Sequence, residues 1–260
     1  MNALIVCVAL FSGCTRIPAT ESTATTTTVS ATMSSTTVTT TATTTTTKST
    51  TTAKPTNITQ TSGKTIIDLL NIHQFPDYPT GCEVVTTTMA LRAAGESISV
   101  AQFVDNYIEC SLRFYWSEGK YYGPDPNEYY LGDPRSENSY GCMAPPIKKA
   151  LIRYFGSDER VADTKGTALP DLCKNYIDRG IPVIVWASIG MVNVVDGTAW
   201  ITPDGSTFTW PINEHCLLLI GYDANKYYFN DPYTGKTVGY AKSVTEKRYE
   251  QLGKQSLAVK

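Results

Sequence analysis

Three residues of this sequence have side chains and positions suited to acyl-transfer chemistry, namely Cys82, His215 and Asp231. Cys82 follows Pro79-Thr80-Gly81 and precedes apolar residues that recur at helical spacing, so we expect it at the first position of a helix. The unpaired backbone N–H groups there carry partial positive charge, which stabilises a thiolate and lowers the pKa of a cysteine. The alternative for a lone cysteine is a buried structural side chain.

His215 precedes the apolar run CLLLIGY, and Asp231 ends the run YYFND. A turn is expected near residues 223–226, so antiparallel pairing of the two runs brings His215 and Asp231 to the same end of a hairpin. A carboxylate there can fix the tautomer of the imidazole, which then accepts the thiol proton through its other nitrogen. Taken singly, a core histidine and an Asp-Pro turn are the alternatives. His73 is the second candidate base.

Several other chemistries lack their usual signatures. The chain has only two histidines and no HExxH pattern, and it contains no GxGxxG, no Walker-type GxxxxGK[ST] and no GxSxG. Its formal net charge of −2 gives no basic footprint for nucleic acid. We therefore expect no metal, no cofactor and no nucleic-acid partner.

The first residues are typical of an exported protein. Residues 1–14 contain a short apolar run, Leu4 to Phe11, and end in Phe-Ser-Gly-Cys. The run is too short to span a bilayer, which needs about 20 residues, but it suits a signal peptide. The ending resembles a bacterial lipobox, in which Cys14 would carry the lipid. An unlipidated signal peptide is the alternative.

A threonine-rich segment, residues 15–63, follows. Between Thr20 and Thr56, 21 of 37 positions are threonine, and so few apolar residues cannot offset the entropy of ordering the chain. The composition predicts a disordered stalk that holds a domain away from a surface. The folded domain is then expected over residues 64–260.

Within that domain, the periodicity predicts a helix that runs from Cys82 to a stop at Gly95, and a second helix with Ser99 as its N-cap. Residues 113–141 are expected to form a long irregular loop rich in aromatic side chains. Further helices are expected over 146–155, 169–179 and 244–252, and strands over 181–187, 208–210, 216–222 and 227–230. A helical first half and a sheet-rich second half predict an α+β fold.

Four runs of the sequence resemble a known family: QFPDYPTGCEVVTTTMAL, GIPVIVWAS, WPINEHCLLLIGYD and FNDPYTG. They look like bacterial cysteine peptidases similar to the bacteriocin-leader-processing peptidases, a C-39-like family with a papain-like fold. The resemblance covers nearly all of residues 65–260. It implies a helical lobe with the nucleophile at a helix N-terminus, packed on an antiparallel sheet lobe that carries the histidine and the aspartate.

Carried over to this chain, the resemblance makes Cys82 the nucleophile, His215 the general base and then acid, and Asp231 its orienting acceptor. Gln74 would stabilise the oxyanion together with the Cys82 backbone N–H. Glu83 stands where the leader-processing enzymes have glycine, and a stalk takes the place of their transporter. The leader-peptide substrate is therefore not carried over.

The resulting hypothesis is an exported, surface-tethered cysteine peptidase with a peptide or protein substrate, which meets the membrane only through its N-terminal lipid. The alternatives are a cell-wall amidase or transpeptidase with the same triad, and a non-catalytic binding module on the same fold. Of the cysteines after Cys14, Cys110 and Cys142 are the favoured disulfide pair because they bracket the long loop. Cys216 is expected to be a small core residue, and five unpaired thiols are the alternative.

Overall fold

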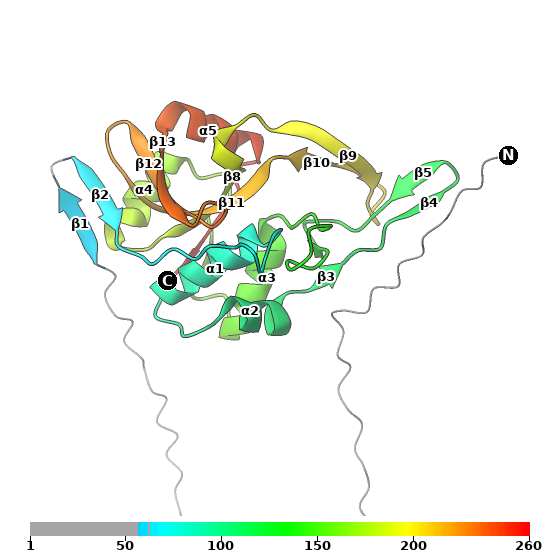
Figure 1. The fold of residues 1–260 in the computed structure, drawn as a ribbon, viewed down its shortest axis with the longest axis horizontal. Coiled ribbons are helices and arrows are strands. Elements are labelled where there is room, and N and C mark those ends of the chain that lie inside the picture. Colours follow the sequence, from blue (N-terminus) through cyan, green and yellow to red (C-terminus); the bar gives the residue numbers. More distant parts are fainter. Residues whose placement is uncertain (1–56, 62) are drawn as a thin grey trace, which may run out of the picture. The chain divides into compact units, whose positions relative to one another are not determined.

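The computed structural model describes residues 57–61 and 63–260. These residues form a mixed α/β arrangement (Figure 1). The described helices are α1 (Cys82–Ala93), α2 (Val100–Tyr107), α3 (Ala144–Phe155), α4 (Leu169–Asn175) and α5 (Lys242–Gln251), with short 3₁₀ turns at Ile177–Arg179 and Ile189–Met191.

Strands account for much of the remainder. They are β1 (Ile58–Thr61), β2 (Lys64–Ile67), β3 (Cys110–Ser111), β4 (Tyr115–Ser117), β5 (Lys120–Tyr122), β6 (Tyr130–Leu131), β7 (Val161–Asp163), β8 (Val183–Ser188), β9 (Val195–Ile201), β10 (Thr207–Ile212), β11 (Glu214–Tyr222), β12 (Lys226–Asp231), β13 (Lys236–Ala241) and β14 (Ser256–Val259).

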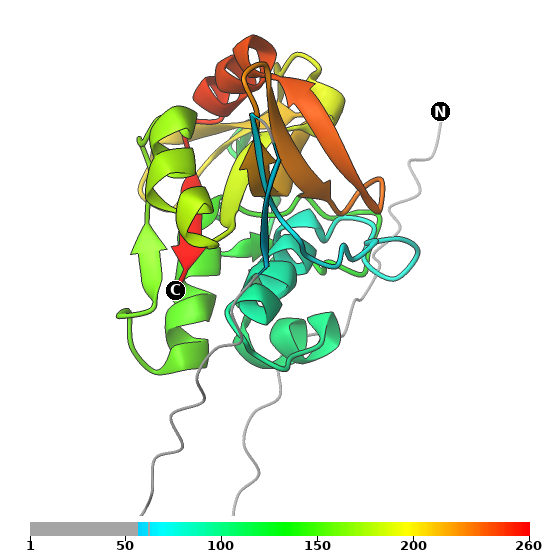
Figure 2. The same cartoon turned by 90° about the vertical axis from the view of Figure 1, so that its left-hand side faces the viewer.

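The main sheet is built around β11. Its strands follow the order β1-β2-β11-β8-β14-β7, and β12 and β13 extend it from β11. All of its pairings are antiparallel. Helices α1 and α3 lie against one face of this sheet and α5 against the other, as two perpendicular views show (Figures 1 and 2). Strands β8 and β11 are consequently buried along almost their whole length.

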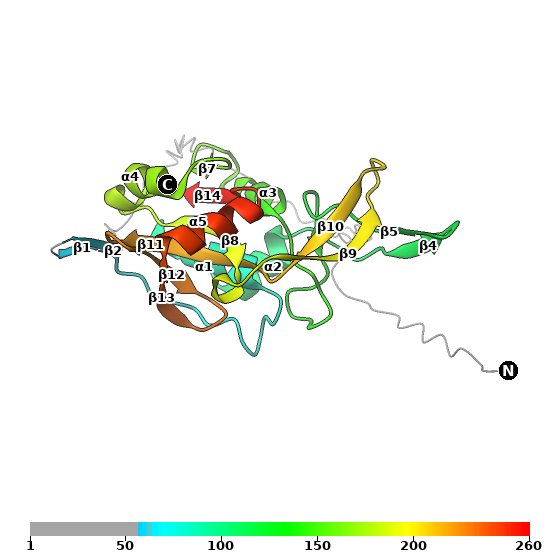
Figure 3. The same ribbon diagram turned by 90° about the horizontal axis from the view of Figure 1, so that it is seen from above.

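A smaller sheet, in the order β10-β9-β5-β4, extends to one side of the main sheet (Figure 3). Trp200 is buried in this part and packs edge-on against Phe114, with ring centroids 5.1 Å apart. The β4–β5 hairpin lies within the stretch expected to be an irregular loop, so that expectation is wrong for residues 115–122. These strands have only three residues each and are rich in aromatic side chains. They are too short for polar and apolar residues to alternate recognisably in the sequence.

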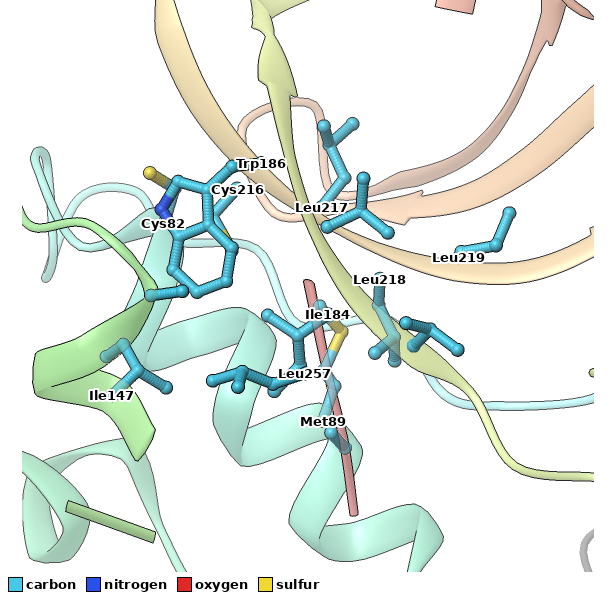
Figure 4. Close-up of a cluster of buried hydrophobic side chains, with 14 of the residues drawn as sticks. Cys82, Met89, Ile147, Ile184, Trp186, Cys216, Leu217, Leu218, Leu219 and Leu257 are labelled. Carbon is cyan, nitrogen blue, oxygen red and sulfur yellow. The ribbon is translucent and has the colours of Figure 1, made fainter. Parts of the chain in front are cut away.

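Helix α1 is buried on nearly all sides, which makes it the centre of the core. Its side chains meet those of β8, β11 and β14 in the cluster of Figure 4, which includes Met89, Ile184, Leu218 and Leu257. Three consecutive threonines of this helix are also fully buried. Their hydroxyls donate to the carbonyl oxygens of Glu83, Val84 and Cys216, so burial leaves none of these hydroxyls without a partner.

Most of the elements expected from periodicity are confirmed. Helix α1 ends at Ala93 and Gly95 takes a positive φ of 89°, while Ser99 caps α2 through a capping box with Gln102. The hairpin of β11 and β12 turns at the expected residues. Strands β7 and β14 are not predicted from the sequence, because their short runs lack a clear period of two and obtain their order from long-range pairing. Strands β9 and β13 are not predicted either, although each pairs with the strand next to it in sequence.

The N-terminal predictions fall largely outside the described residues. The signal peptide with Cys14, and most of the threonine-rich segment, lie within residues 1–56. At the C-terminal end of that segment, however, residues 58–61 form β1 and pair with β2. The ordered domain therefore begins before residue 64. Within the described residues, no helix has the length and apolar character needed to cross a bilayer.

The packing predicts which leucines carry stability. Leu218 is fully buried beneath α1, whereas Leu70 is 82% exposed. We expect Leu218→Ala to lower the free energy of unfolding by about 3 kcal/mol, since it leaves a cavity, and Leu70→Ala to change it by less than about 0.5 kcal/mol. Urea titration of both variants checks this, and equal losses would contradict the burial described here.

Candidate active site

Cys82 is the first residue of α1, with Gly81 as the N-cap. The turn before the helix is tight: a Cβ at Gly81 would lie 2.7 Å from the Cβ of Tyr78. Glycine therefore allows the lead-in to fold closely against the helix. The helix is fixed to the sheet because Thr86 Oγ1 donates to the Cys216 carbonyl oxygen at 3.0 Å. The backbone of Cys216 in turn lies beside the Cys82 sulfur and favours its ionised form.

His215 and Asp231 lie side by side on the β11–β12 hairpin. His215 Nε2 is 2.8 Å from Asp231 Oδ1, and both side chains are about 98% buried. Asp231 Oδ1 also accepts from the Tyr233 backbone N–H at 2.9 Å. Burial is the largest single effect and disfavours the charged carboxylate, but the interactions with His215, Tyr233 and Thr234 together outweigh it and hold the pKa of Asp231 below its ordinary value. Because Nε2 contacts Asp231, Nδ1 is the nitrogen available for proton exchange with a thiol.

Gln74 reaches the same region from the segment before α1. Its backbone N–H donates to the Pro232 carbonyl oxygen at 2.9 Å, directly beyond Asp231. The side chain is buried, and its Nε2 donates to the Pro79 carbonyl oxygen at 3.0 Å. The Gln74 backbone is thus anchored to the residue after β12, and its side-chain amide to the segment just before Cys82.

The thiol does not hydrogen-bond His215 within the part of the chain that the structure describes. Cys82 Sγ instead lies 3.3 Å from Glu83 Oε2. Burial, followed by the nearby carboxyls of Glu83 and Glu214, raises the pKa of Cys82 well above its ordinary value. The expectation that the helix N-terminus lowers this pKa is therefore wrong for this arrangement, because desolvation and two acidic neighbours outweigh the helix.

Glu83 and Glu214 are the site residues that sequence reasoning did not identify. Both are buried. Glu83 Oε1 accepts from the Cys142 backbone N–H at 2.7 Å, and burial raises the pKa of Glu83 to about 7. Burial and the neighbouring Glu83 raise the pKa of Glu214 well above its ordinary value. The only sequence signal is an acidic residue in the buried first turn of a helix.

Cys82, Glu83 and Glu214 are also the group whose donor atoms have a spacing suited to a metal ion, with all three atoms within 4.8 Å of one another. A thiolate and two carboxylates are ligands that a divalent ion such as Zn²⁺ accepts. Both oxygens of Glu83, however, already contact protein groups. Either bound protons or a cation could therefore neutralise the negative charge of these three side chains.

The remaining candidates lie outside this cluster. His73 packs its ring against Phe75, with centroids 5.7 Å apart, and it has no carboxylate partner within the described part of the chain. The second candidate base therefore lacks the partner that His215 has. No disulfide joins the cysteines of the described residues, which rules out the favoured pair of Cys110 and Cys142 in this structure. Cys216 is fully buried, as expected of a core residue.

Comparisons with known proteins agree with one another. A family model described as the Peptidase_C39 like family matches residues 65–257. The uncharacterized protein YvpB of Bacillus subtilis (strain 168) is 28% identical over 191 residues, which cover 74% of this chain and 73% of that protein. The crystal structure of a candidate C-39-like peptidase from Bacillus anthracis superposes with a TM-score of 0.67 at 25% identity, covering 76% of this chain and 98% of the other.

The raised pKa of the buried Glu83 predicts how the stability of the fold depends on pH. Its pKa is about 7 in the folded protein against 4.5 as the ordinary value, so the folded state binds more protons than the unfolded state between these pH values. Stability must then fall as pH rises. Between pH 5 and pH 8 we expect a loss of about 2–3 kcal/mol that Glu83→Gln does not show. Urea titrations at both pH values measure it.

The exposed substitution Glu159→Gln provides the baseline for these titrations. If Glu83→Gln loses as much stability as the wild type between pH 5 and pH 8, Glu83 does not hold a proton in the folded protein.

Proposed function

Because the chain belongs to the Peptidase_C39 like family, we propose that it is a cysteine peptidase that hydrolyses peptide bonds through Cys82, His215 and Asp231. The observation that carries the proposal is the buried His215–Asp231 pair on β11 and β12. Strand β11 is also the strand against which the helix beginning at Cys82 is packed. A pairing of this kind has a direct chemical use, since it holds one imidazole nitrogen and leaves the other for a nucleophile.

The fold that we propose is papain-like. Helices α1, α2 and α3 form a helical part that begins with the nucleophile, and the antiparallel strands β8, β11, β12 and β13 form a sheet part that carries the base and its partner. The TM-score of 0.67 to the Bacillus anthracis protein supports a shared fold. In this arrangement the reacting groups lie where the helical and sheet parts meet, so each part positions one of them rigidly.

The proposed reaction begins with transfer of the Cys82 proton to His215. The thiolate then attacks the substrate carbonyl carbon, and the charge on the carbonyl oxygen is stabilised by the Cys82 backbone N–H and the Gln74 side-chain amide. His215 returns the proton to the leaving amine, which departs and leaves a thioester on Cys82. Water, deprotonated by His215, hydrolyses the thioester and regenerates the thiol.

For location, we propose an exported protein whose domain is tethered at the cell surface by a lipid on Cys14. The proposal rests on the apolar run and the Phe-Ser-Gly-Cys ending in the first 14 residues. The threonine-rich segment supplies the length of chain for a tether. A peptide or protein outside the cytoplasm is the substrate class that this location favours.

Peptide-library profiling by mass spectrometry tests the proposed activity. We expect wild-type protein to cleave peptides and Cys82→Ala to reduce cleavage to background. Asp231→Asn should slow cleavage by up to about ten-thousandfold, because the imidazole loses its orienting carboxylate. Cys173→Ala is the matched control, since Cys173 is a buried thiol of α4 outside the site.

Retention of cleavage by Cys82→Ala would contradict the proposal. Cleavage of cell-wall amides in place of peptides would assign the same residues to an amidase. Absence of turnover in the wild type on either substrate class would favour a binding module.

A further inference from the structure

We propose that Glu83 acts as a neutral carboxylic acid that hydrogen-bonds the Cys82 sulfur, and that loss of its proton switches the nucleophile off. This inference rests on the proposed function, because it concerns the same thiol. It adds a catalytic residue that contacts the reacting atom, at 3.3 Å, and it gives the site a defined pH window.

The described part of the site contains two buried carboxyl groups and no cationic side chain to balance them. Glu83 and Glu214 are both buried beside the buried Cys82. Among the described residues, the ion pairs of the structure include neither carboxyl, so no lysine, arginine or histidine neutralises them. Within the part of the chain that the structure describes, Glu214 Oε1 has no hydrogen-bond partner. Two desolvated carboxylates without a cation are strongly disfavoured, so protons must neutralise them.

Two hydrogen-bonding groups share the protons around Glu83 Oε2, the Tyr130 hydroxyl and the Cys82 thiol. Tyr130 contacts this oxygen at 3.1 Å through its hydroxyl. The same hydroxyl forms a short hydrogen bond to the Thr80 carbonyl oxygen, which can only accept. A phenol has one proton, and Thr80 takes it. The contact between Tyr130 and Glu83 is then a hydrogen bond only if Glu83 supplies the proton.

A protonated Glu83 completes a chain of donors. The Cys82 thiol donates to Glu83 Oε2, Glu83 donates to the Tyr130 oxygen, and Tyr130 donates to the Thr80 carbonyl oxygen. The other oxygen, Oε1, remains fixed by the Cys142 backbone N–H. The loop is built closely around it, since a Cβ at Gly141 would lie 2.3 Å from Oε1. The carboxyl therefore cannot turn away from the sulfur without breaking these contacts.

The chain explains how a buried thiol can become a thiolate. When Cys82 passes its proton to His215, the Glu83 proton is next to the sulfur and can turn toward it. The backbone of Cys216 also lies beside the sulfur and favours the thiolate. Ionised Glu83 would instead place a negative charge 3.3 Å from the thiolate and remove a donor. The ionisable groups that face Glu83 are Cys82 on α1, Tyr130 on β6, Cys142 before α3, and Glu214 and Cys216 on β11.

The direction of the pH effect follows from these groups. Burial raises the pKa of Glu83 to about 7 and raises that of Glu214 in the same direction. The cysteines and Tyr130 keep their protons to higher pH, because burial raises pKa values that are ordinarily 9 and 10. Glu83 thus ionises near neutrality. Below pH 7 the neutral acid permits the thiolate, and above pH 7 its charge opposes the thiolate.

The test is the rate of Cys82 alkylation by iodoacetamide in the full-length protein, followed from pH 5.5 to 8.5 and mapped to each cysteine by mass spectrometry. An ordinary thiol reacts faster as pH rises. We expect Cys82 to react about tenfold more slowly at pH 8 than at pH 6, because its proton passes to His215 rather than to solvent and ionised Glu83 opposes that transfer by about one pKa unit. In Glu83→Gln the neutral amide can still donate a hydrogen bond to the Cys82 sulfur, so this fall in the alkylation rate between pH 6 and pH 8 should disappear.

Glu214→Gln is the matched variant, an isosteric change in the same cluster, and it should keep the fall because the carboxyl that hydrogen-bonds the Cys82 sulfur is that of Glu83. Tyr130→Phe gives an independent test even if Glu83→Gln does not fold, through the direction in which the fall moves along the pH axis. Removing the oxygen that accepts the Glu83 proton should move the fall to lower pH, whereas a tyrosine that donates to a carboxylate would move it to higher pH.

Persistence of the fall in Glu83→Gln, or a shift to higher pH in Tyr130→Phe, overturns the inference. Loss of the fall on adding EDTA also overturns it, since a bound cation would then be responsible. His215→Ala separates the two proposals. If it leaves Cys82 reactivity unchanged at pH 6, the proposed function fails. If it slows alkylation while Glu83→Gln retains the fall, only the role of Glu83 fails.

Discussion

The packing of the α1 N-terminus against β11 is the contact on which the rest of the site depends. It excludes water from Cys82 and places the sulfur beside the backbone of Cys216. The hydrogen bond from Thr86 to the same strand fixes the helix in that position. Since β11 also carries His215, one interface between a helix and a strand sets the position of both the nucleophile and the base. The hairpin to β12 then adds Asp231.

Burial at this contact has opposite effects on the two halves of the site. It strengthens the hydrogen bond between His215 and Asp231, because that pair has little competition from water. For Cys82 it raises the cost of forming a thiolate, and the neighbouring carboxyls add to that cost. The resting protein therefore holds a protonated thiol, and reactivity depends on where protons lie among Cys82, Glu83 and His215. A site of this kind is governed by pH as much as by geometry.

The sequence allowed the hairpin and the nucleophile helix to be predicted because their signals are local. Gly95 and Ser99 mark helix ends by their own conformational preferences, and the turn near Asp223 joins two apolar runs of suitable length. Strand β14 obtains its order from β7 and β8, which are distant in sequence, so its four residues carry no signal of their own. The pairing of Glu83 with Glu214 also exists only once α1 lies on β11.

The most direct test of the account is the reactivity of Cys82 relative to the other described cysteines at pH 6, in wild type and in His215→Ala. Brief treatment of the full-length protein with iodoacetamide, followed by peptide mapping, gives a rate for each thiol. The account predicts that Cys82 is labelled faster than the also buried Cys173 in the wild type, because Cys82 has a base to take its proton, and that its labelling slows at least about tenfold without His215. Equal labelling of Cys82 and Cys173, or a rate at Cys82 that ignores His215, would contradict it.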